Sequence, residues 1–109
     1  MRRGEVWTVA GGPDYVGKLR PAVIIQDDAF TDTASVTICG LTTTIVTALL
    51  ARVTVEPSAS NGLRVLSQIM ADKVTTVVRS KLGRRIGHLS DSDMTHVDRA
   101  LLIFLGLAR

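Results

Sequence analysis

The segment Leu19-Arg20-Pro21-Ala22-Val23-Ile24-Ile25-Gln26-Asp27-Asp28 decides how this chain folds. Its apolar, β-branched run is bounded by turn residues, which is typical of a buried strand, and we expect a strand over Pro21–Gln26. Because proline has no backbone N–H, Pro21 belongs at the start of that strand or on a sheet edge. Arg20 then stands at the mouth of a rigid strand, where it could grip a phosphate or cap the strand.

Short strands are expected on both sides of this segment. The glycine-punctuated loop Gly11–Leu19 joins it to a first strand, and a polar turn over Asp27–Thr33 follows it. Regular alternation between apolar and polar residues marks a later strand. The expected strands are Glu5–Ala10, Pro21–Gln26, Ser35–Leu41, Ala51–Glu56, Val65–Val78 (one long or bent strand, or two short ones) and Arg85–Leu89.

The pattern changes to a helical period near the C-terminus. Ser90 and Asp93 have nearly the spacing of a capping box, and Gly106 stands where a C-terminal cap is expected. Strands followed by one amphipathic helix predict a mainly β protein, a small, partly open barrel with a C-terminal helix. The apolar residues that recur at helical intervals are Met94, Val97, Leu101, Phe104 and Leu105.

One connection is unusually apolar. Ile45–Leu50 could be a short helix, a strand extension or a surface that is buried against another subunit.

Composition narrows the class of protein. The chain has 109 residues, of which 46% are hydrophobic, and this favours a single domain over residues 1–109. Its one cysteine, Cys39, excludes an internal disulfide and fits a cytoplasmic setting. The charged start Met1–Glu5 has no apolar run behind it, so no secretory signal is expected, and no stretch has the length to cross a membrane.

The net charge of +3 is unevenly distributed. The basic excess lies in the C-terminal half and includes Arg79, Lys81, Arg84 and Arg85, with no acid between them. Such a cluster attracts nucleic acid or an acidic partner, but taken alone it is better explained as a solvated turn with ordinary surface charge.

The residues do not point to metal or cofactor chemistry. His88, His96 and Cys39 have no recognised ligand spacing, and a buried, inert thiol is expected for Cys39. What remains is a set of polar residues at strand ends, which could meet in one cleft. Each also has a structural interpretation: threonines favour strands, Asp72 and Lys73 could form a surface ion pair, and Arg20 could be a cap. These residues are Arg20, Thr42, Thr43, Thr44, Gln68, Asp72, Lys73, Thr75 and Thr76.

Five motifs follow one another over nearly the whole chain. They are Met1–Trp7, Lys18–Gln26, Leu41-Thr42-Thr43, Ser67–Val77 and Ile86–Leu89 with the closing helix. In this order they resemble the MazF/PemK (Kid) family, the toxins of type II toxin–antitoxin modules. The resemblance implies a small SH3-like barrel of the CcdB/PemK type, usually a homodimer.

The resemblance also implies an activity. Family members are metal-independent, sequence-specific endoribonucleases that cleave single-stranded RNA, using the 2′-hydroxyl of the RNA itself as the nucleophile, and so inhibit translation and growth. Arg20 and Thr42 would be catalytic, and Asp14 is a possible general base or simply a turn-forming residue. The remaining expected RNA-binding residues are Tyr15, Lys18, Thr43, Gln68, Asp72, Lys73 and Thr75.

A partner and an alternative accompany this hypothesis. The resemblance implies a MazE-like antitoxin with an acidic, partly disordered tail, which the basic excess of this chain fits. The alternative is a non-enzymatic toxin like CcdB, which shares the fold and poisons DNA gyrase by binding; a catalytically silent binding domain is a third possibility. The Arg-Pro and Leu-Thr-Thr motifs favour the nuclease.

Overall fold

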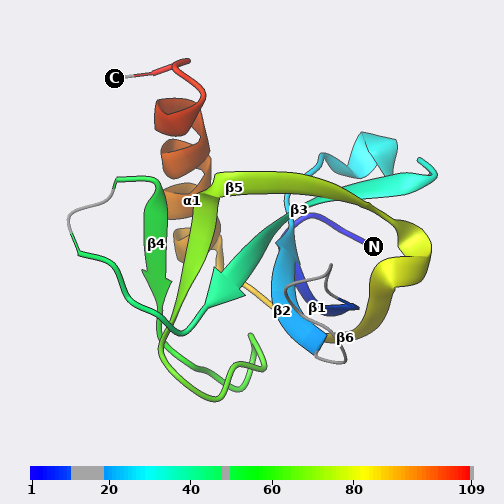
Figure 1. Cartoon of the computed structure of the whole chain (residues 1–109), viewed down its shortest axis with the longest axis horizontal. Helices are drawn as coiled ribbons and strands as arrows, with labels where there is room; N and C mark the ends of the chain where they lie inside the picture. Colours follow the sequence, from blue (N-terminus) through cyan, green and yellow to red (C-terminus); the bar gives the residue numbers. More distant parts are fainter. Residues whose placement is uncertain (11–18, 48–49, 109) are drawn as a thin grey trace.

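The computed structural model describes residues 1–10, 19–47 and 50–108, which form one antiparallel sheet and one helix (Figure 1). The sheet has six strands in the order β4-β5-β3-β2-β1-β6. Two short 3-10 helices lie in the connections, η2 between β2 and β3 and η3 between β5 and β6. The elements are β1 (Glu5–Ala10), β2 (Leu19–Ile24), η2 (Asp28–Phe30), β3 (Ser35–Thr42), β4 (Arg52–Val55), β5 (Ser67–Val78), η3 (Arg79–Lys81), β6 (Leu82–His88) and α1 (Asp91–Phe104).

The long strand β5 bends the sheet into a partly open barrel. Its first half pairs with β4 and with the end of β3, and its second half pairs with the start of β3. A register shift between Cys39 and Leu41 separates the two halves. β5 thereby runs from beside α1 across the molecule to η3, with β4 and β6 at the edges of the sheet (Figure 1). The predicted mainly β barrel with a C-terminal helix is confirmed.

Several predicted strand boundaries are corrected by one to three residues. β2 covers Leu19–Ile24 rather than 21–26, because its pairing with β1 already begins at Leu19. Pro21 pairs with Thr8 of β1 and precedes the first pair between β2 and β3, which is Ala22 with Gly40. The missing N–H of Pro21 therefore costs no bond between β2 and β3. The last strand begins at Leu82, which pairs with Val9, and not at residue 85. Residues 67–78 form one strand, which settles the choice left open for that segment.

Each face of the sheet carries its own apolar cluster. On one face Val6, Val23 and Cys39 pack with Val97 and Ala100 of α1. The other face carries a second cluster, made of Val9, Ala22, Ile24, Val36, Ile38 and Leu82. Alternation along β2 and β3 sends neighbouring side chains into different clusters, so both faces of the central strands are packed. Burial raises the pKa of the Cys39 thiol to about 12, as expected for an inert structural cysteine.

The helix begins and ends where its capping residues predict. Ser90 Oγ accepts a hydrogen bond from the Asp93 backbone N–H at 3.0 Å. Gly106 has a φ of 75°, and the N–H of Leu107 donates to the carbonyl of Leu102 at 2.8 Å, which closes a Schellman motif. No helix in the described part of the chain is long and apolar enough to span a membrane.

The predicted basic cluster is divided by the fold. Arg79 is committed to the turn that follows η2, since its guanidinium donates to the carbonyl oxygens of Thr31 and Thr33. Arg85 pairs with Glu5, with 3.2 Å between Nε and Oε2. The cluster therefore does not form one continuous patch.

The apolar connection is irregular where the structure describes it. Residues 45–47 form neither helix nor strand, so those two alternatives are wrong for them, and residues 48–49 lie outside the described part of the chain. Ile45 and Val46 are exposed, so burial against another subunit stays a prediction.

A close backbone contact joins the segment after β4 to β6. Gly62 has a φ of 71°, and a Cβ added to it would lie 2.1 Å from the carbonyl oxygen of Ile86. Asn61, only 3% exposed, accepts from the N–H groups of Ser58 and Leu63 and donates to the carbonyl of Glu56. Only glycine fits at position 62, because any side chain would collide with β6.

Arg52 and Asp72 form a well-shielded ion pair between β4 and β5. Their side chains are 10% and 20% exposed, and two hydrogen bonds of 2.6 and 3.2 Å join them. The hydrogen bond from Arg52 lowers the pKa of Asp72 below its usual value. The pair links residues that lie far apart in the sequence.

The substitution Gly62→Ala is expected to lower the free energy of unfolding by about 2–5 kcal/mol, because it combines a left-handed backbone with a clash against Ile86. Gly106→Ala is the matched control: its φ is 75° but nothing lies within 4 Å, so about 1 kcal/mol is expected. Urea unfolding of both variants measures the difference, and equal losses would contradict the clash.

Asp72→Asn is expected to cost about 1–3 kcal/mol of unfolding free energy at neutral pH, because it leaves Arg52 shielded without its counterion. The folded-state pKa of Asp72 is lowered, so its contribution is present above the unfolded value and is lost as the pH falls below about 4. Unfolding curves of the wild type and the variant should converge in that range. A difference that does not depend on pH would contradict the ion pair, and Arg52→Met with Asp72→Asn completes the double-mutant cycle.

Candidate active site

Arg20 and Thr42 share the sheet face that points away from α1. Ala22 and Ile24 lie in the cluster on that face, and Arg20 has the same alternation along β2. On β3, Leu41 is buried in the cluster beside α1, which places the side chain of Thr42 on the opposite face.

Arg20 and Thr42 lie at the same end of neighbouring strands. Ala22 of β2 pairs with Gly40 of β3. Arg20 lies two residues before Ala22, and Thr42 lies two residues after Gly40, which is the same direction along the sheet because the strands are antiparallel. Arg20 is exposed and is held on its other side by pairing with Val9 of β1. Thr42 is half-buried, and its Oγ1 accepts from the backbone N–H of Thr44 at 3.1 Å. Its hydroxyl proton remains able to donate to a ligand.

A pocket of about 390 Å³, here the Arg20 pocket, opens on this face. Arg20 lines it from β2, while Lys73 and Thr75 line it from β5. Ile38 and Met70 supply apolar lining. The structure therefore brings two cations and a hydroxyl from the predicted set around one hollow, with Thr42 at the same end of the sheet. This arrangement can receive an anionic group.

The side-chain amide of Gln68, which is predicted to bind RNA, is engaged within the fold. Gln68 is 3% exposed, and its amide forms two hydrogen bonds with the backbone of Val46: Oε1 accepts at 3.0 Å and Nε2 donates at 2.9 Å. Nε2 also lies 3.2 Å from Oγ1 of Thr54. Gln68 pairs with Thr42 across β3 and β5, so it fixes the segment that leaves Thr42.

Asp72 also serves the fold. Its carboxylate is paired with Arg52 and not with Lys73, so the surface ion pair considered from the sequence is wrong. Lys73 is exposed and lines the Arg20 pocket, which agrees with a role in binding an anion. Asp72 supports the strand that carries it.

Three predicted residues, Asp14, Tyr15 and Lys18, lie outside the described residues. Their roles stay predictions. Within residues 1–10, 19–47 and 50–108, no group of three His, Cys, Asp or Glu side chains could hold a metal ion.

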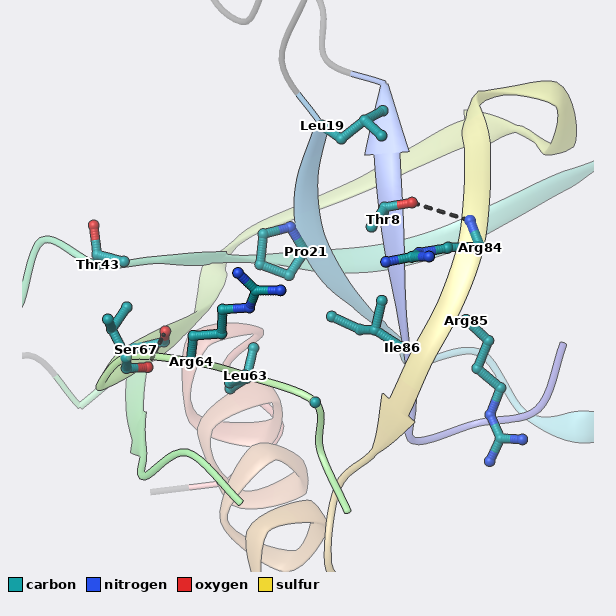
Figure 2. Close-up of a pocket in the computed structure, with 12 residues that line it drawn as sticks. Thr8, Leu19, Pro21, Thr43, Leu63, Arg64, Ser67, Arg84, Arg85 and Ile86 are labelled. Carbon is teal, nitrogen blue, oxygen red and sulfur yellow. Dashed lines mark hydrogen bonds between the residues drawn. The ribbon is translucent and has the colours of Figure 1, made fainter. Parts of the chain in front are cut away.

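A second, larger cleft of about 710 Å³, here the Arg64 cleft, opens on the other side of β2 (Figure 2). Leu19 lines this cleft and Arg20 lines the Arg20 pocket, while Pro21 lies between the two hollows and lines both. Arg64 and Thr43 also line the cleft. Arg64 was not among the predicted residues, because it is an isolated cation in a loop and gives no signal in the sequence.

Comparison with known proteins identifies the family. Residues 2–105 match the family described as PemK-like, MazF-like toxin of type II toxin–antitoxin system. The chain is 52% identical over 108 residues to the "Probable endoribonuclease MazF" of Mycolicibacterium smegmatis, covering 99% of each sequence. It is 30% identical over 115 residues to "Endoribonuclease MazF9" of Mycobacterium tuberculosis, covering 98% of each.

Solved structures agree with the fold and the family. A mycobacterial endoribonuclease in complex with its cognate antitoxin is similar with a TM-score of 0.85 and 28% identity, over 100% of this chain and 98% of that one. The resemblance predicted from the five sequence motifs is confirmed. The chain belongs to the PemK-like, MazF-like toxin family of type II toxin–antitoxin systems.

Proposed function

We propose that this toxin is a sequence-specific, metal-independent endoribonuclease that cleaves single-stranded RNA and thereby inhibits translation and growth. The observation that carries the proposal is the placement of Arg20 and Thr42 at the same end and on the same face of neighbouring strands. The family match and two relatives named as MazF endoribonucleases support it.

The chemistry suits a site that offers charge and hydrogen bonds but no protein nucleophile. The RNA 2′-oxygen forms a bond to the adjacent phosphorus and loses its proton, while the bond from phosphorus to the 5′-oxygen breaks and that oxygen gains a proton. The products are a 2′,3′-cyclic phosphate and a 5′-hydroxyl. Arg20 neutralises the negative charge that develops on the non-bridging oxygens of the pentacovalent phosphorane, and Thr42 donates a hydrogen bond to one of them. Asp14 is the proposed general base.

The proposed RNA-binding residues divide into two groups. Lys73 and Thr75 line the Arg20 pocket and contact the RNA there, and Thr43 contacts it from the neighbouring Arg64 cleft. Tyr15 and Lys18 are the other proposed contacts. Gln68 and Asp72 act behind this surface, since their polar atoms are engaged with Val46, Thr54 and Arg52. Their influence on RNA is through the strands that they hold in place.

The toxin is further proposed to act as one domain over residues 1–109, in the cytoplasm, as a homodimer neutralised by a MazE-like antitoxin. Apolar side chains exposed near the end of α1 support an interface with another subunit. They are Leu102, Phe104, Leu105 and Leu107, which are 43–72% exposed. A CcdB-like gyrase poison is not favoured, because the family match is to PemK and MazF toxins.

Purified protein incubated with a long RNA in EDTA is expected to cut at a short recurring sequence and leave 5′-hydroxyl ends. Arg20→Ala and Thr42→Val are each expected to lower kcat by about 10²–10³-fold, because each removes a group that stabilises the transition state. Lys81→Met, which removes an exposed cation on η3, should cleave like the wild type.

Mapping the ends distinguishes the alternatives. RNA that stays intact while DNA gyrase is arrested would overturn the nuclease in favour of the gyrase poison. Cleavage that EDTA abolishes would overturn metal independence.

Gln68→Glu tests whether the amide positions Thr42. A glutamate carboxylate cannot donate to the carbonyl of Val46, whereas a protonated glutamate can. We expect kcat at neutral pH to fall about 10- to 100-fold with little change in KM. Relative to the wild type, kcat should recover as the pH falls toward the glutamate pKa, which burial should raise above about 4.3. Gln68→Ala is the control that cannot recover, and equal pH profiles for the two variants would contradict the role.

A further inference from the structure

The strand β5 carries extra residues where it passes Gly40 of β3. In the pairing of these strands, the two-residue step from Cys39 to Leu41 is matched by a five-residue step on β5. Strict alternation would send Met70 and Lys73, which are three residues apart within that step, to opposite faces of the sheet. Both line the Arg20 pocket, so the bulge in β5 brings an apolar side chain and a cation into the same hollow.

Gly40 leaves room for Met70 inside this pocket. Both residues line it, and a Cβ added to Gly40 would lie 3.2 Å from Cε of Met70. The backbone of Gly40 does not have a positive φ, so the absence of a side chain there matters for space and not for conformation. The end of the flexible Met70 side chain therefore forms the part of the pocket that lies over Gly40.

The Arg20 pocket joins cations to an apolar lining. Arg20 and Lys73 are exposed, whereas the apolar residues of the pocket are buried or half-buried. A phosphate group satisfies only the cations and would leave the apolar lining uncovered. A nucleotide carries a phosphate beside a planar base with apolar faces, and so matches both parts of the pocket. The described apolar lining consists of Val9, Ala10, Pro21, Ala22, Ile38, Leu41, Met70 and Val77.

We propose that the Arg20 pocket holds one nucleobase of the RNA beside the scissile phosphate, and that Met70, lying over Gly40, selects this base by size. The inference rests on the proposed function, because it takes Arg20 to meet the scissile phosphate. It adds Met70 to the site as a specificity-determining residue. An apolar contact discriminates by size about 10- to 200-fold for each methylene that is added or removed.

Two substitutions change the depth of the pocket in opposite directions. Met70→Ala removes the side chain over Gly40 and enlarges the pocket. Gly40→Ala places a methyl group 3.2 Å from Cε of Met70, so the methionine moves outward and the pocket becomes shallower. Met94→Ala is the matched control, because Met94 is also half-buried beside a glycine, Gly4, but packs against the cluster beside α1.

The experiment incubates the full chain with an RNA library of random sequence in EDTA. Sequencing of the 5′-hydroxyl ends over time gives the relative kcat/KM of each cut sequence. Met70→Ala should raise the purine-to-pyrimidine ratio of kcat/KM about tenfold at one position of the cut site. Gly40→Ala should lower that ratio at the same position, whereas Met94→Ala should leave it unchanged.

Opposite shifts at one position support the inference, because a merely structural role would slow the cleavage of all sequences alike. An equal loss of rate at every sequence in the Met70 and Gly40 variants overturns it. If sedimentation shows that these variants have also lost a dimer formed by the wild type, the pocket is a contact between subunits.

A binding measurement separates this inference from the endoribonuclease proposal. Fluorescence anisotropy gives Kd for short 2′-O-methyl oligomers of adenine or of uracil, which lack the attacking hydroxyl. If the wild type cleaves no RNA, but Met70→Ala favours the adenine oligomer and Gly40→Ala the uracil oligomer, the endoribonuclease proposal fails while the base pocket stands. If the wild type cleaves no RNA and neither variant changes the ratio of the two Kd values, both proposals fail.

Discussion

The antiparallel pairing of β2 with β1 on one side and β3 on the other is the constraint on which the rest of this structure depends. It fixes the register of the three central strands, and the register decides which side chains enter which apolar cluster. A slip of one residue would turn Val23 out of the cluster beside α1 and bring Arg20 to that side. The core and the site are therefore determined by the same hydrogen bonds.

Pro21 shows how the sequence adapts to this pairing. It lies where β2 has β1 as a partner and has not yet begun its pairs with β3, so its missing N–H leaves no bond to β3 unmade. The same place marks the end of the sheet at which Arg20 and Thr42 emerge. A residue that restricts the backbone thus stands next to the residue proposed to meet the phosphate, which limits the movement of Arg20 at its base.

Much of this could be predicted because it depends on local pattern. Alternation and capping residues predicted the strands and the helix, and the ordered motifs placed Arg20 and Thr42 on neighbouring strands. Contacts between distant residues could not be predicted in this way. The sequence predicts that Arg79 is a surface cation, yet its guanidinium donates hydrogen bonds to the carbonyl oxygens of Thr31 and Thr33. Asp72 and Gln68 look equally available for a ligand, and only the folded chain shows that Arg52 and Val46 engage them. Arg64 and Arg84 line the same cleft because the close contact of Gly62 with Ile86 brings the segment before β5 against β6.

The bonds between Gln68 and Val46 have a consequence for how this toxin can diverge. Gln68 binds the backbone N–H and carbonyl of Val46, whereas the side chain of Val46 is exposed. Nearly any residue at position 46 therefore keeps both hydrogen bonds, and only proline removes the donor. The segment beyond Thr42 can therefore change its surface chemistry over generations while its path stays fixed. A new RNA preference could arise there without a new fold.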